Sequence, residues 1–566
     1  MEALQHLPEY NSKWLLYGVG FENLGKNDRY EKALLREIKP NEVLLKVEAV
    51  SLCFSDIKVI KQGNEHPRLI GRDLSSDPVV LAHEVAASVV YAGSMRQSMF
   101  SPGEKYIIQP DIFYDGKAVT MGYVLDGALQ QYIIAGDEIL DGDEGCYLFP
   151  MRSGIGYSEA ALCEPWSCVE ASYHIPYRTV LKNQGIALII GNEGIYGEPY
   201  TMGELITQTH CPKRIIVSNV NRNFFNEIKD ISNKYKIDLI EEDNVKNWPD
   251  INVKYTDSAG FDDIIMLGAP EPRMVEEAAD MLARFGVFAI VASEPIAQKA
   301  NIDVGRLHYD GILFTGTNTK SIETAYSCQT SIDIPSGGAM WLAGGCGPMG
   351  QMHVQRTCER DNGPEFILVT DIDDTRLQEV KNKFSNLAEA RGASLVCATA
   401  NEAPLTDEKF DYIVILAPVI ELIAQAFDKL APNGIVNLFA GVPIGTKIPV
   451  DVSNCYLHGQ RWIGSSGTSN AHMRSILEKI ESKSLETNRS VAAVGGLDAA
   501  KDGLIAVAQG AKPGKVIIYP QIHFPLTSIM DLKQNAPVVF EKLEDGAFWS
   551  IEAEMALLAV SEYGDD

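Results

Sequence analysis

The feature that most constrains the fold is a glycine-rich stretch just past the middle of the chain. A short apolar run over 339–343 is long enough for one buried strand, and it leads into the pattern Gly345-x-Gly347-x-x-Gly350. The pattern is followed by residues that predict a helix over 349–356. A strand, a glycine turn and a helix in this order are typical of a dinucleotide-binding βαβ unit.

Each glycine of this pattern has a physical role in holding a pyrophosphate. The first makes a tight turn, the second lets the backbone approach the phosphates, and the third lets the helix pack closely on the strand. The N-terminus of the following helix then faces the anion. The sequence therefore predicts cofactor contacts at Gly345, Cys346, Gly347, Pro348, Met349 and Gly350.

A second apolar run, over 366–370, ends in Asp371, which lies 21 residues after Gly350. A carboxylate at this place accepts hydrogen bonds from an adenosine ribose 2′-hydroxyl and repels a 2′-phosphate, so the sequence favours NAD over NADP. Ile372 and Arg376 follow closely and complete the predicted cofactor-binding set. The alternative interpretation is a glycine-rich turn of a βα unit that binds no ligand.

Composition narrows the class of protein. The chain has 566 residues, a length of about three or four domains, and its 46% apolar and 22% charged residues are ordinary for a globular protein. Its net charge of −27 argues against non-specific binding to nucleic acid or to an anionic membrane. No apolar run approaches the roughly 20 residues of a membrane helix, and the first residues have no secretory signal pattern. The 10 scattered cysteines, without a C-x-x-C pair, fit a reducing cytoplasm.

The N-terminal region has the pattern of a compact β-rich domain and contains side chains suited to a metal. Apolar and polar residues alternate over 41–50, which predicts a half-buried strand, and further short strand patterns with glycine turns follow. Cys53, His83 and Glu164, with Glu84 adjacent, supply a thiolate, an imidazole and a carboxylate. Such ligands with an open fourth position make a catalytic zinc site. Taken alone, these residues are better explained as a core cysteine and structural side chains than as metal ligands.

Several motifs resemble those of the zinc-dependent medium-chain dehydrogenases of the alcohol dehydrogenase superfamily. They are Cys53-x-Ser55-Asp56, His83-Glu84, Gly103-Glu-Lys-Tyr106, Glu159-Ala-Ala-Leu-Cys-Glu164-Pro165, and the late Gly495-Gly-Leu497 with Gly514-Lys-Val516. They occur in the family's order across nearly the whole chain. The Glu-Pro pair at the third ligand position is similar to the sorbitol (polyol) dehydrogenase branch, because other alcohol dehydrogenases have a cysteine there.

This resemblance implies one catalytic zinc. In the polyol branch the metal is held by residues that match Cys53, His83 and a glutamate, and that glutamate is here Glu84 or Glu164. The glutamate that does not bind the metal would be close to it or bridged by water. The candidate metal ligands are therefore Cys53, His83, Glu84 and Glu164.

The resemblance also implies a reversible, NAD-dependent oxidation of a secondary alcohol. Zinc would act as a Lewis acid on the substrate oxygen, Ser55 would take the alcohol proton, and Asp56 would orient a ligand. A local cap or turn hydroxyl is the alternative for Ser55. By the same resemblance the substrate is a polyol, a sugar or a sugar phosphate. The candidate catalytic residues are Ser55, Asp56, Glu84 and Glu164.

Three departures from the family pattern bear on the chemistry. Ala82 stands where the family usually has glycine before His-Glu. Lys58 stands where a histidine often ends the proton relay. No cysteine lies between Glu84 and Gly145, so the four-cysteine lobe of a structural zinc is missing. We therefore expect one zinc and no structural zinc.

The glycine pattern begins 181 positions after Glu164, where the family has a couple of dozen. The extra segment resembles the segment that follows it. Five pairs of landmarks match, with offsets between 148 and 153 positions. A near-constant offset indicates an internal duplication, and we predict two Rossmann-like domains in tandem. The pairs are Ile186–Gly197 with Met340–Gly350, Arg214–Asn219 with Phe366–Asp371, Phe261–Ile265 with Phe410–Val414, Ala283–Ile290 with Ala431–Leu438, and Leu307-His308 with Leu457-His458.

The two copies differ in the residues that would meet a nucleotide. The first has Asn192-Glu193 where the second has Gly345-Cys346, and a carboxylate in that turn opposes a pyrophosphate. The first also has Asn219 in place of Asp371. We therefore expect the first copy to be a degenerate, structural domain; the alternative is that it binds a different nucleotide or a regulatory ligand.

A structural first copy has one evident use. In the family, nucleotide domains commonly pair edge to edge between subunits, and the first copy could supply that pairing within one chain. We therefore expect a monomer with an intramolecular pseudo-dimer, or a homodimer. Two sheets with unpaired edges would exclude the pseudo-dimer.

The predicted architecture is α/β: a β-rich GroES-like catalytic domain plus two tandem Rossmann-like doubly wound domains. The expected cofactors are one Zn²⁺ and NAD(H), and the expected partner is a small-molecule alcohol or ketone, with no nucleic acid and no membrane. Two other functions stay open: NADH-dependent reduction of a keto-sugar or biosynthetic intermediate, and a non-catalytic, dehydrogenase-derived scaffold. The expected boundaries are 1–175 (catalytic), 176–325 (degenerate copy), 326–479 (NAD-binding copy) and 480–566 (return to the catalytic domain).

Overall fold

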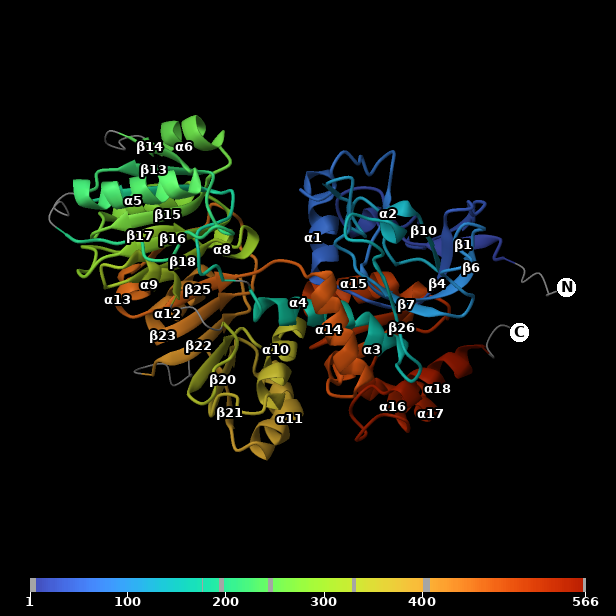
Figure 1. The fold of residues 1–566 in the computed structure, drawn as a ribbon. Coiled ribbons are helices and arrows are strands. Elements are labelled where there is room, and N and C mark those ends of the chain that lie inside the picture. The colour runs from blue at the N-terminus through green and yellow to red at the C-terminus, as the bar shows by residue number, and fades with distance from the viewer. Residues whose placement is uncertain are drawn as a thin grey trace. The chain divides into compact units, whose positions relative to one another are not determined.

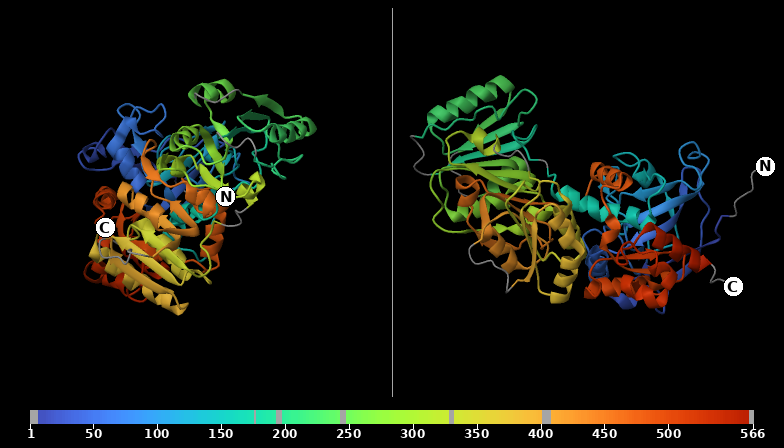
Figure 2. Two further views of the ribbon diagram at one scale, coloured as in Figure 1. Left: turned by 90° about the vertical axis from the view of Figure 1, so that its left-hand side faces the viewer. Right: turned by 90° about the horizontal axis from the view of Figure 1, so that it is seen from below.

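The computed structural model describes residues 7–175, 177–192, 198–242, 248–327, 332–400 and 408–562 (Figures 1 and 2). The chain divides into two compact units. The first contains residues 1–171, 347–352 and 467–566, and the second contains residues 172–346 and 353–466. None of the helices in the described ranges combines the length and the apolar character needed to cross a membrane. The predicted domain boundaries stay a proposal.

The first unit is built on an eight-stranded, mostly antiparallel sheet. Its strand order is β11-β7-β6-β4-β27-β26-β28, and β10 also pairs with β4. Its strands are β4 (Val43–Ser51), β6 (Glu84–Ala92), β7 (Lys105–Ile108), β10 (Tyr132–Ala135), β11 (Leu148–Pro150), β26 (Val491–Gly496), β27 (Lys515–Tyr519) and β28 (Thr527–Ser528). Smaller sheets pair β1 (Tyr10–Lys13) with β3 (Glu31–Leu34), β2 (Leu15–Leu16) with β5 (Val79–Val80), and β8 (Phe113–Tyr114) with β9 (Lys117–Ala118).

Helices surround this sheet, and the last segment of the chain returns to it. β27 pairs antiparallel with β4, with Ile517 opposite Ser51, which confirms the predicted return of the C-terminal region. The helices are α1 (Phe54–Gln62), α2 (Asp137–Leu140), α3 (Tyr157–Ala161), α4 (Cys163–Ser172), α14 (Asn470–Glu481), α15 (Ala500–Gln509), α16 (Leu532–Asn535), α17 (Pro537–Phe540) and α18 (Ile551–Glu562).

β4 is buried on both faces, and the prediction of a half-buried strand is wrong in this respect. All of its side chains are buried except Lys46, which is partly exposed. α3 packs against this strand, and β10, β6 and β27 all pair with it. Alternating apolar and polar residues predict that one face of a strand is buried, but in β4 the face with the polar residues is buried as well.

The second unit contains one twelve-stranded sheet with the order β14-β13-β12-β15-β16-β18-β25-β23-β22-β19-β20-β21. The first half consists of β12 (Ile186–Gly191), β13 (Arg214–Ser218), β14 (Asp238–Glu241), β15 (Phe261–Leu267), β16 (Leu282–Val291) and β18 (Leu313–Thr317). The second half consists of β19 (Ala339–Ala343), β20 (Phe366–Asp371), β21 (Ser394–Thr399), β22 (Phe410–Ile415), β23 (Leu430–Leu438) and β25 (Arg461–Gly464).

Each half has the topology of a doubly wound nucleotide-binding sheet. Counted along the chain, the strands of each half lie in the order 3-2-1-4-5-6, and all neighbours within a half are parallel. The two predicted Rossmann-like copies are therefore confirmed. Their helices are α5 (Arg222–Tyr235), α6 (Trp248–Thr256), α7 (Pro272–Asp280), α8 (Val304–Tyr309) and α9 (Ile322–Ser327) in the first copy, and α10 (Pro348–Glu359), α11 (Asp374–Ala390), α12 (Ile420–Lys429) and α13 (Ser453–Leu457) in the second.

The two halves meet edge to edge. β18 pairs antiparallel with β25 at Phe314 and Trp462 (Figure 1). A second ribbon pairs β17 (Ala300–Asp303) with β24 (Lys447–Val450), with Asn301 opposite Pro449. Both residue pairs are 148 positions apart, as the repeat is, so equivalent residues face each other as they do across a local two-fold axis. The edge pairing that the pseudo-dimer hypothesis requires is present.

Aromatic packing stabilises this join. The Trp462 ring lies 5.2 Å from the Phe314 ring and 4.9 Å from the Phe427 ring, and Phe288 lies 5.5 Å from Phe314. All four side chains belong to one apolar core that runs through both copies. Burial of side chains of this size contributes about 1.5–3 kcal/mol each. The two copies therefore share one continuous hydrophobic core.

Candidate metal centre and cofactor loop

Two strands of the first unit bring the predicted metal ligands together. β4 and β6 are antiparallel, and Ser51 at the end of β4 lies opposite Glu84 at the start of β6. Cys53 therefore follows one strand at the place where His83 precedes the other. Cys53, His83 and Glu84 each offer one ligand atom, and these three atoms lie within 4.8 Å of one another.

Asp56 holds the two ligand-bearing segments in register. It lies in the first turn of α1, whose N-cap is Cys53. One carboxylate oxygen accepts a hydrogen bond from the backbone N–H of Cys53 at 3.0 Å, and the other accepts one from the N–H of Ala82 at 3.0 Å. Asp56 Oδ1 also lies 3.6 Å from His83 Nδ1. This arrangement suits the orienting role expected for Asp56, which stays a prediction.

The residue before His83 is strained. Ala82 has a left-handed backbone with φ of 72°. This conformation costs an L-residue with a Cβ roughly 1–2 kcal/mol, so glycine is the natural choice at this position. The Ala82 carbonyl accepts a hydrogen bond from the N–H of Ala128 at 2.8 Å, and its own N–H is held by Asp56. These two bonds keep the turn, and with it His83, in place.

Glu84 forms a buried ion pair that the sequence analysis did not identify. Lys515 Nζ donates to Glu84 Oε1 at 2.6 Å and to Oε2 at 2.8 Å, and the two side chains are 3% and 0% exposed. Burial acts to lower the pKa of Lys515, but the charges of Glu84 and Cys53 outweigh it and raise that pKa above its usual value. The motif Gly514-Lys-Val was noted in the sequence, but only the pairing of β27 with β4 brings this lysine to the site.

Glu164 lies in the first turn of α4 and is also buried. The pKa of its carboxyl group is raised to about 7, mainly by burial; the charge of His83 acts to lower this pKa and that of Glu84 to raise it. The Cys168 thiol donates to Glu164 Oε1 at 3.5 Å. The two candidates for the third ligand thus differ: Glu84 lies nearer to Cys53 and His83 but is bonded to Lys515, whereas Glu164 forms no ion pair with any residue that the structure describes.

The Ser55 hydroxyl faces the same group. Its Oγ lies 3.4 Å from His83 Nε2, and Ser55 sits in the first turn of α1. A serine hydroxyl both donates and accepts hydrogen bonds, which suits the transfer of a proton. The proton-accepting role of Ser55 stays a prediction.

An aromatic and basic wall flanks His83, and the sequence analysis missed it. The Tyr123 ring lies 6.1 Å from the His83 ring and 5.3 Å from the His66 ring. The Arg68 guanidinium lies over the same tyrosine, 5.5 Å from its ring centroid. Residues 66–68 and 123 are far apart in sequence and belong to no recognisable motif. Only the fold brings them together beside the ligands.

The glycine pattern lies between β19 and α10, as predicted. The left-handed turn falls at Gly344, one residue before the pattern, where φ is 79°. A Cβ at Gly345 would lie 2.7 Å from Val369 Cγ1, so close packing requires glycine there. A Cβ at Gly347 would meet no atom within 4 Å, so the backbone at this position is open to a pyrophosphate.

Asp371 ends β20 and lies beside this loop. One of its carboxylate oxygens accepts a hydrogen bond from the N–H of Cys346 at 3.1 Å, and the other accepts one from the N–H of Ile372 at 2.8 Å. These two bonds fix the carboxylate beside the glycine turn. Ile372 is 91% exposed, and Arg376 on α11 lies 3.7 Å from Asp373. The predicted cofactor contacts of these residues stay a proposal.

In the first copy, the position that corresponds to Asp371 is occupied by the side-chain amide of Asn219. Asn219 follows β13 with a left-handed φ of 54°, and its side-chain N–H donates to the Gly191 carbonyl at 2.7 Å. Asn192 is placed at the end of β12, whereas Glu193 and the rest of the turn up to Gly197 lie outside the described residues. The structural role expected for this copy stays a proposal.

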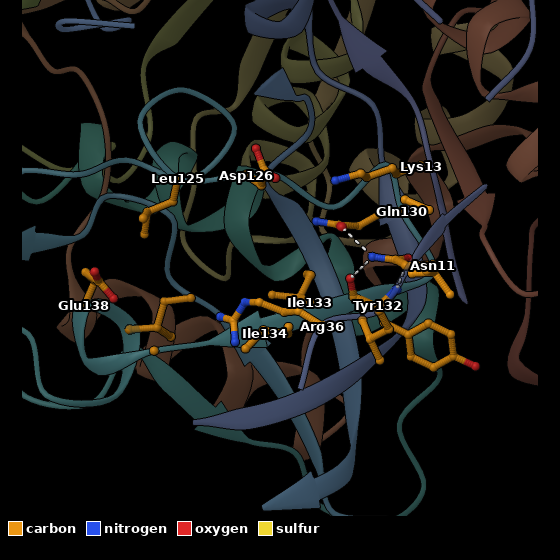
Figure 3. Close-up of a pocket in the computed structure, with 15 residues that line it drawn as sticks. Asn11, Lys13, Arg36, Leu125, Asp126, Gln130, Tyr132, Ile133, Ile134 and Glu138 are labelled. Carbon is orange, nitrogen blue, oxygen red and sulfur yellow. Dashed lines mark hydrogen bonds between the residues drawn. The ribbon is translucent and has the colours of Figure 1, made fainter. Parts of the chain in front are cut away.

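A surface pocket of about 310 Å³ lies elsewhere in the first unit, next to β1 and β10 (Figure 3). Several of its polar side chains are bonded within the protein. Asn11 donates to Gln130 Oε1 and to the Tyr132 carbonyl, both at 2.9 Å, and Arg36 pairs with Glu42 at 2.7 Å. No predicted site residue lines this pocket, and we assign no function to it.

Known proteins share parts of this architecture. Residues 39–140 match the family model of the alcohol dehydrogenase GroES-like domain. The chain is 22% identical over 562 residues to the uncharacterized protein YggP of Escherichia coli K12, with 96% of each chain covered. It is 26% identical over 317 residues to L-sorbose 1-phosphate reductase of Klebsiella pneumoniae, with 52% of this chain and 73% of the relative covered. The crystal structure of 2R,3R-butanediol dehydrogenase from Bacillus subtilis aligns with a TM-score of 0.49 and 12% identity, over 90% of this chain and 99% of that one.

Proposed function

We propose that this chain interconverts a secondary alcohol and its ketone with one zinc ion and NAD(H). The premise is that the chain belongs to the medium-chain dehydrogenase/reductase superfamily, as an oxidoreductase of the alcohol and polyol dehydrogenase type. The proposed substrate is a polyol, a sugar or a sugar phosphate. The observation that carries the proposal is the convergence of Cys53, His83 and Glu84 within 4.8 Å, beside the Ser55 hydroxyl.

The donor set suits zinc. A thiolate, an imidazole and a carboxylate are its preferred protein ligands, and Asp56 beside one ring nitrogen of His83 is the kind of second partner that metal-binding histidines have. Cys53 and His83 would hold the ion together with Glu84 or Glu164. Bound there, zinc would supply Lewis-acid activation of the substrate oxygen.

The chain's own side chains can handle the proton. Ser55 Oγ can accept a proton from a substrate hydroxyl, because it lies 3.4 Å from His83 Nε2. Glu164, with a pKa of about 7, can take up or release a proton near neutral pH. Lys515 holds Glu84 in position through two hydrogen bonds.

The cofactor would be held by the second copy. The open backbone at Gly347 can receive the pyrophosphate, and the Asp371 carboxylate can accept hydrogen bonds from a ribose while repelling a 2′-phosphate. Bound NAD⁺ would accept the hydride, and NADH would return it. In the first copy, Asn219 bonds to Gly191 and offers no carboxylate.

A metal analysis combined with a substrate screen tests the proposal. We expect about one zinc per chain, and NADH formation with one or more polyols or phosphorylated polyols. Cys53→Ala should lose both zinc and activity. Cys146→Ala is the matched control, because this partly buried thiol of the same unit packs on the core and, among the described residues, hydrogen-bonds only the Leu148 carbonyl. A wild-type protein that binds neither zinc nor NADH would overturn the proposal and favour a scaffold.

The reductive direction is the second candidate. The similarity to a relative named for the reduction of L-sorbose 1-phosphate favours it. The same screen run with NADH and ketoses, at equal enzyme concentration, separates the two directions through their kcat/KM values.

A further inference from the structure

Two cations beside the candidate metal centre lack full anionic partners. Arg68 reaches one acidic side chain, Asp111, through a single N–H at 3.3 Å, and 45% of its side chain is exposed. The other guanidinium N–H groups are unused within the described part of the chain. Lys58, on α1, forms no hydrogen bond or ion pair with any described residue. Cations with unused donors beside a candidate active site favour an anionic ligand.

Both cations lie next to the predicted ligands rather than on a remote surface. The Tyr123 ring connects Arg68 to His83, in steps of 5.5 Å and 6.1 Å. Lys58 follows Ser55 by three residues on α1, so the two share one face of the helix. His66 packs on Tyr123 and lies within the field of both cations. Burial, together with the charges of Arg68 and Lys58, lowers the pKa of His66 to about 4.

We propose that Arg68 and Lys58 form a phosphate-binding subsite, which holds the phosphate of a phosphorylated ketose or polyol while the reacting oxygen lies at the candidate metal centre. The inference rests on the proposed function and narrows its substrate to sugar phosphates. A guanidinium offers two parallel N–H donors to a phosphate, and an ammonium adds a point charge. A phosphate monoester carries about −1.5 to −2 charges at pH 7. Two cations therefore balance the charge of a phosphate better than the single charge of a carboxylate.

Charge explains why such a subsite is needed. The chain has a net charge of −27, and Asp111, Glu164 and Glu84 are acidic groups close to the site. A dianionic substrate is repelled by such a field unless local cations compensate. Asp111 then has a positioning role: its single, long hydrogen bond directs the guanidinium and leaves the remaining donors for the phosphate.

The test compares a phosphorylated substrate with its free sugar. NADH-dependent reduction of L-sorbose 1-phosphate and of L-sorbose is measured for the zinc-loaded wild type and for Arg68→Gln, Arg68→Lys and Lys58→Gln. We expect Arg68→Gln to raise KM for the phosphorylated ketose at least about tenfold, the loss of one charged hydrogen bond or more, and to change kcat/KM for L-sorbose less than about twofold. Arg68→Lys should lie between, since it keeps the charge but loses the fork.

Inhibition by inorganic phosphate provides a second readout. Phosphate should compete with L-sorbose 1-phosphate in the wild type, and its inhibition constant should rise at least about tenfold in Arg68→Gln. Arg29→Gln is the matched control, because Arg29 is an exposed arginine of the same unit whose side chain contacts no described site residue. Melting curves confirm that each variant is folded, and Arg68→Lys serves if Arg68→Gln is not.

The outcomes separate the inference from the function on which it rests. Equal losses for both substrates in Arg68→Gln, or a wild type that reduces L-sorbose as efficiently as its phosphate, would refute the subsite and leave the proposed function intact. A zinc-loaded wild type that reduces neither compound, and oxidises no polyol in the wider screen, would refute the proposed function and this inference with it.

Discussion

Lys515→Met is expected to destabilise the first unit strongly, because it leaves the Glu84 carboxylate buried without its cation. The ammonium lies 2.6 Å and 2.8 Å from the two carboxylate oxygens, and neither side chain is more than 3% exposed. Removing one partner of such a buried pair costs about 3–5 kcal/mol. Methionine has a similar length and volume, so a cavity adds little to this cost.

A double-mutant cycle isolates the pair. Glu84→Gln alone leaves the Lys515 ammonium buried, so it should also be destabilising, whereas the combined variant removes both charges and should recover most of the loss. We expect a coupling free energy of at least about 2 kcal/mol between the two positions.

The measurement is urea unfolding of the metal-free protein, read for each unit by hydrogen exchange of the β4, β27 and β12 amides. Since a chain of two units need not unfold in one step, β12 of the second unit is the internal control. An unfolding free energy of the first unit in Lys515→Met within about 1 kcal/mol of the wild type would refute the reasoning. Zinc also distinguishes the two candidate third ligands. Saturating zinc should reduce the loss of unfolding free energy in Lys515→Met if Glu84 binds the metal, and should leave that loss unchanged if Glu164 binds it.

Three further variants test other parts of the structure. In the metal-free protein, stability should fall as pH rises from about 5 to 7, because the Glu164 carboxyl keeps its proton up to a pKa of about 7 while the unfolded chain releases it earlier; Glu164→Gln should flatten this slope in urea titrations at successive pH values. Asp371→Ser should lower kcat/KM for NAD⁺ about 10- to 100-fold and raise the ratio of NADP⁺ to NAD⁺ use, and an unchanged ratio would exclude the ribose contact. Trp462→Ala should cost about 3–5 kcal/mol and speed hydrogen exchange in β18 and β25. Trp248, which is buried in the first copy, provides the control: in Trp248→Ala, hydrogen exchange in β18 and β25 should stay slow. Equally fast exchange in both variants would contradict a local role for Trp462.

Much of the fold could be predicted because local patterns reflect backbone constraints. The glycine turn after 339–343 and the helix that follows were recognisable, since glycine spacing and apolar periodicity act over a few residues. The duplication was visible because it recurs at a constant offset over more than a hundred residues. From these features the Rossmann-like fold of each copy followed, whereas the edge pairing that joins them was a hypothesis based on the family resemblance.

The parts that could not be predicted depend on pairing between distant strands. Cys53 and His83 had the right chemistry, but their convergence depends on the register that places Ser51 opposite Glu84. The Lys515 partner of Glu84 arrives from a strand more than 400 residues later, and no local pattern marks it. Arg68 and Tyr123 are equally invisible, because an arginine in a loop normally faces water.

The pairing of β18 with β25 within one chain relaxes the constraint on substitutions at this interface. In a two-fold homodimer a residue on the axis meets its own copy, so every substitution enters the interface twice. Here Phe314 meets Trp462, two rings of different size at equivalent positions, and each side can adjust to the other separately. The pairing also survives any dilution, because both edges belong to one chain. One nucleotide domain can therefore part with its cofactor residues while the molecule retains an intact, paired sheet.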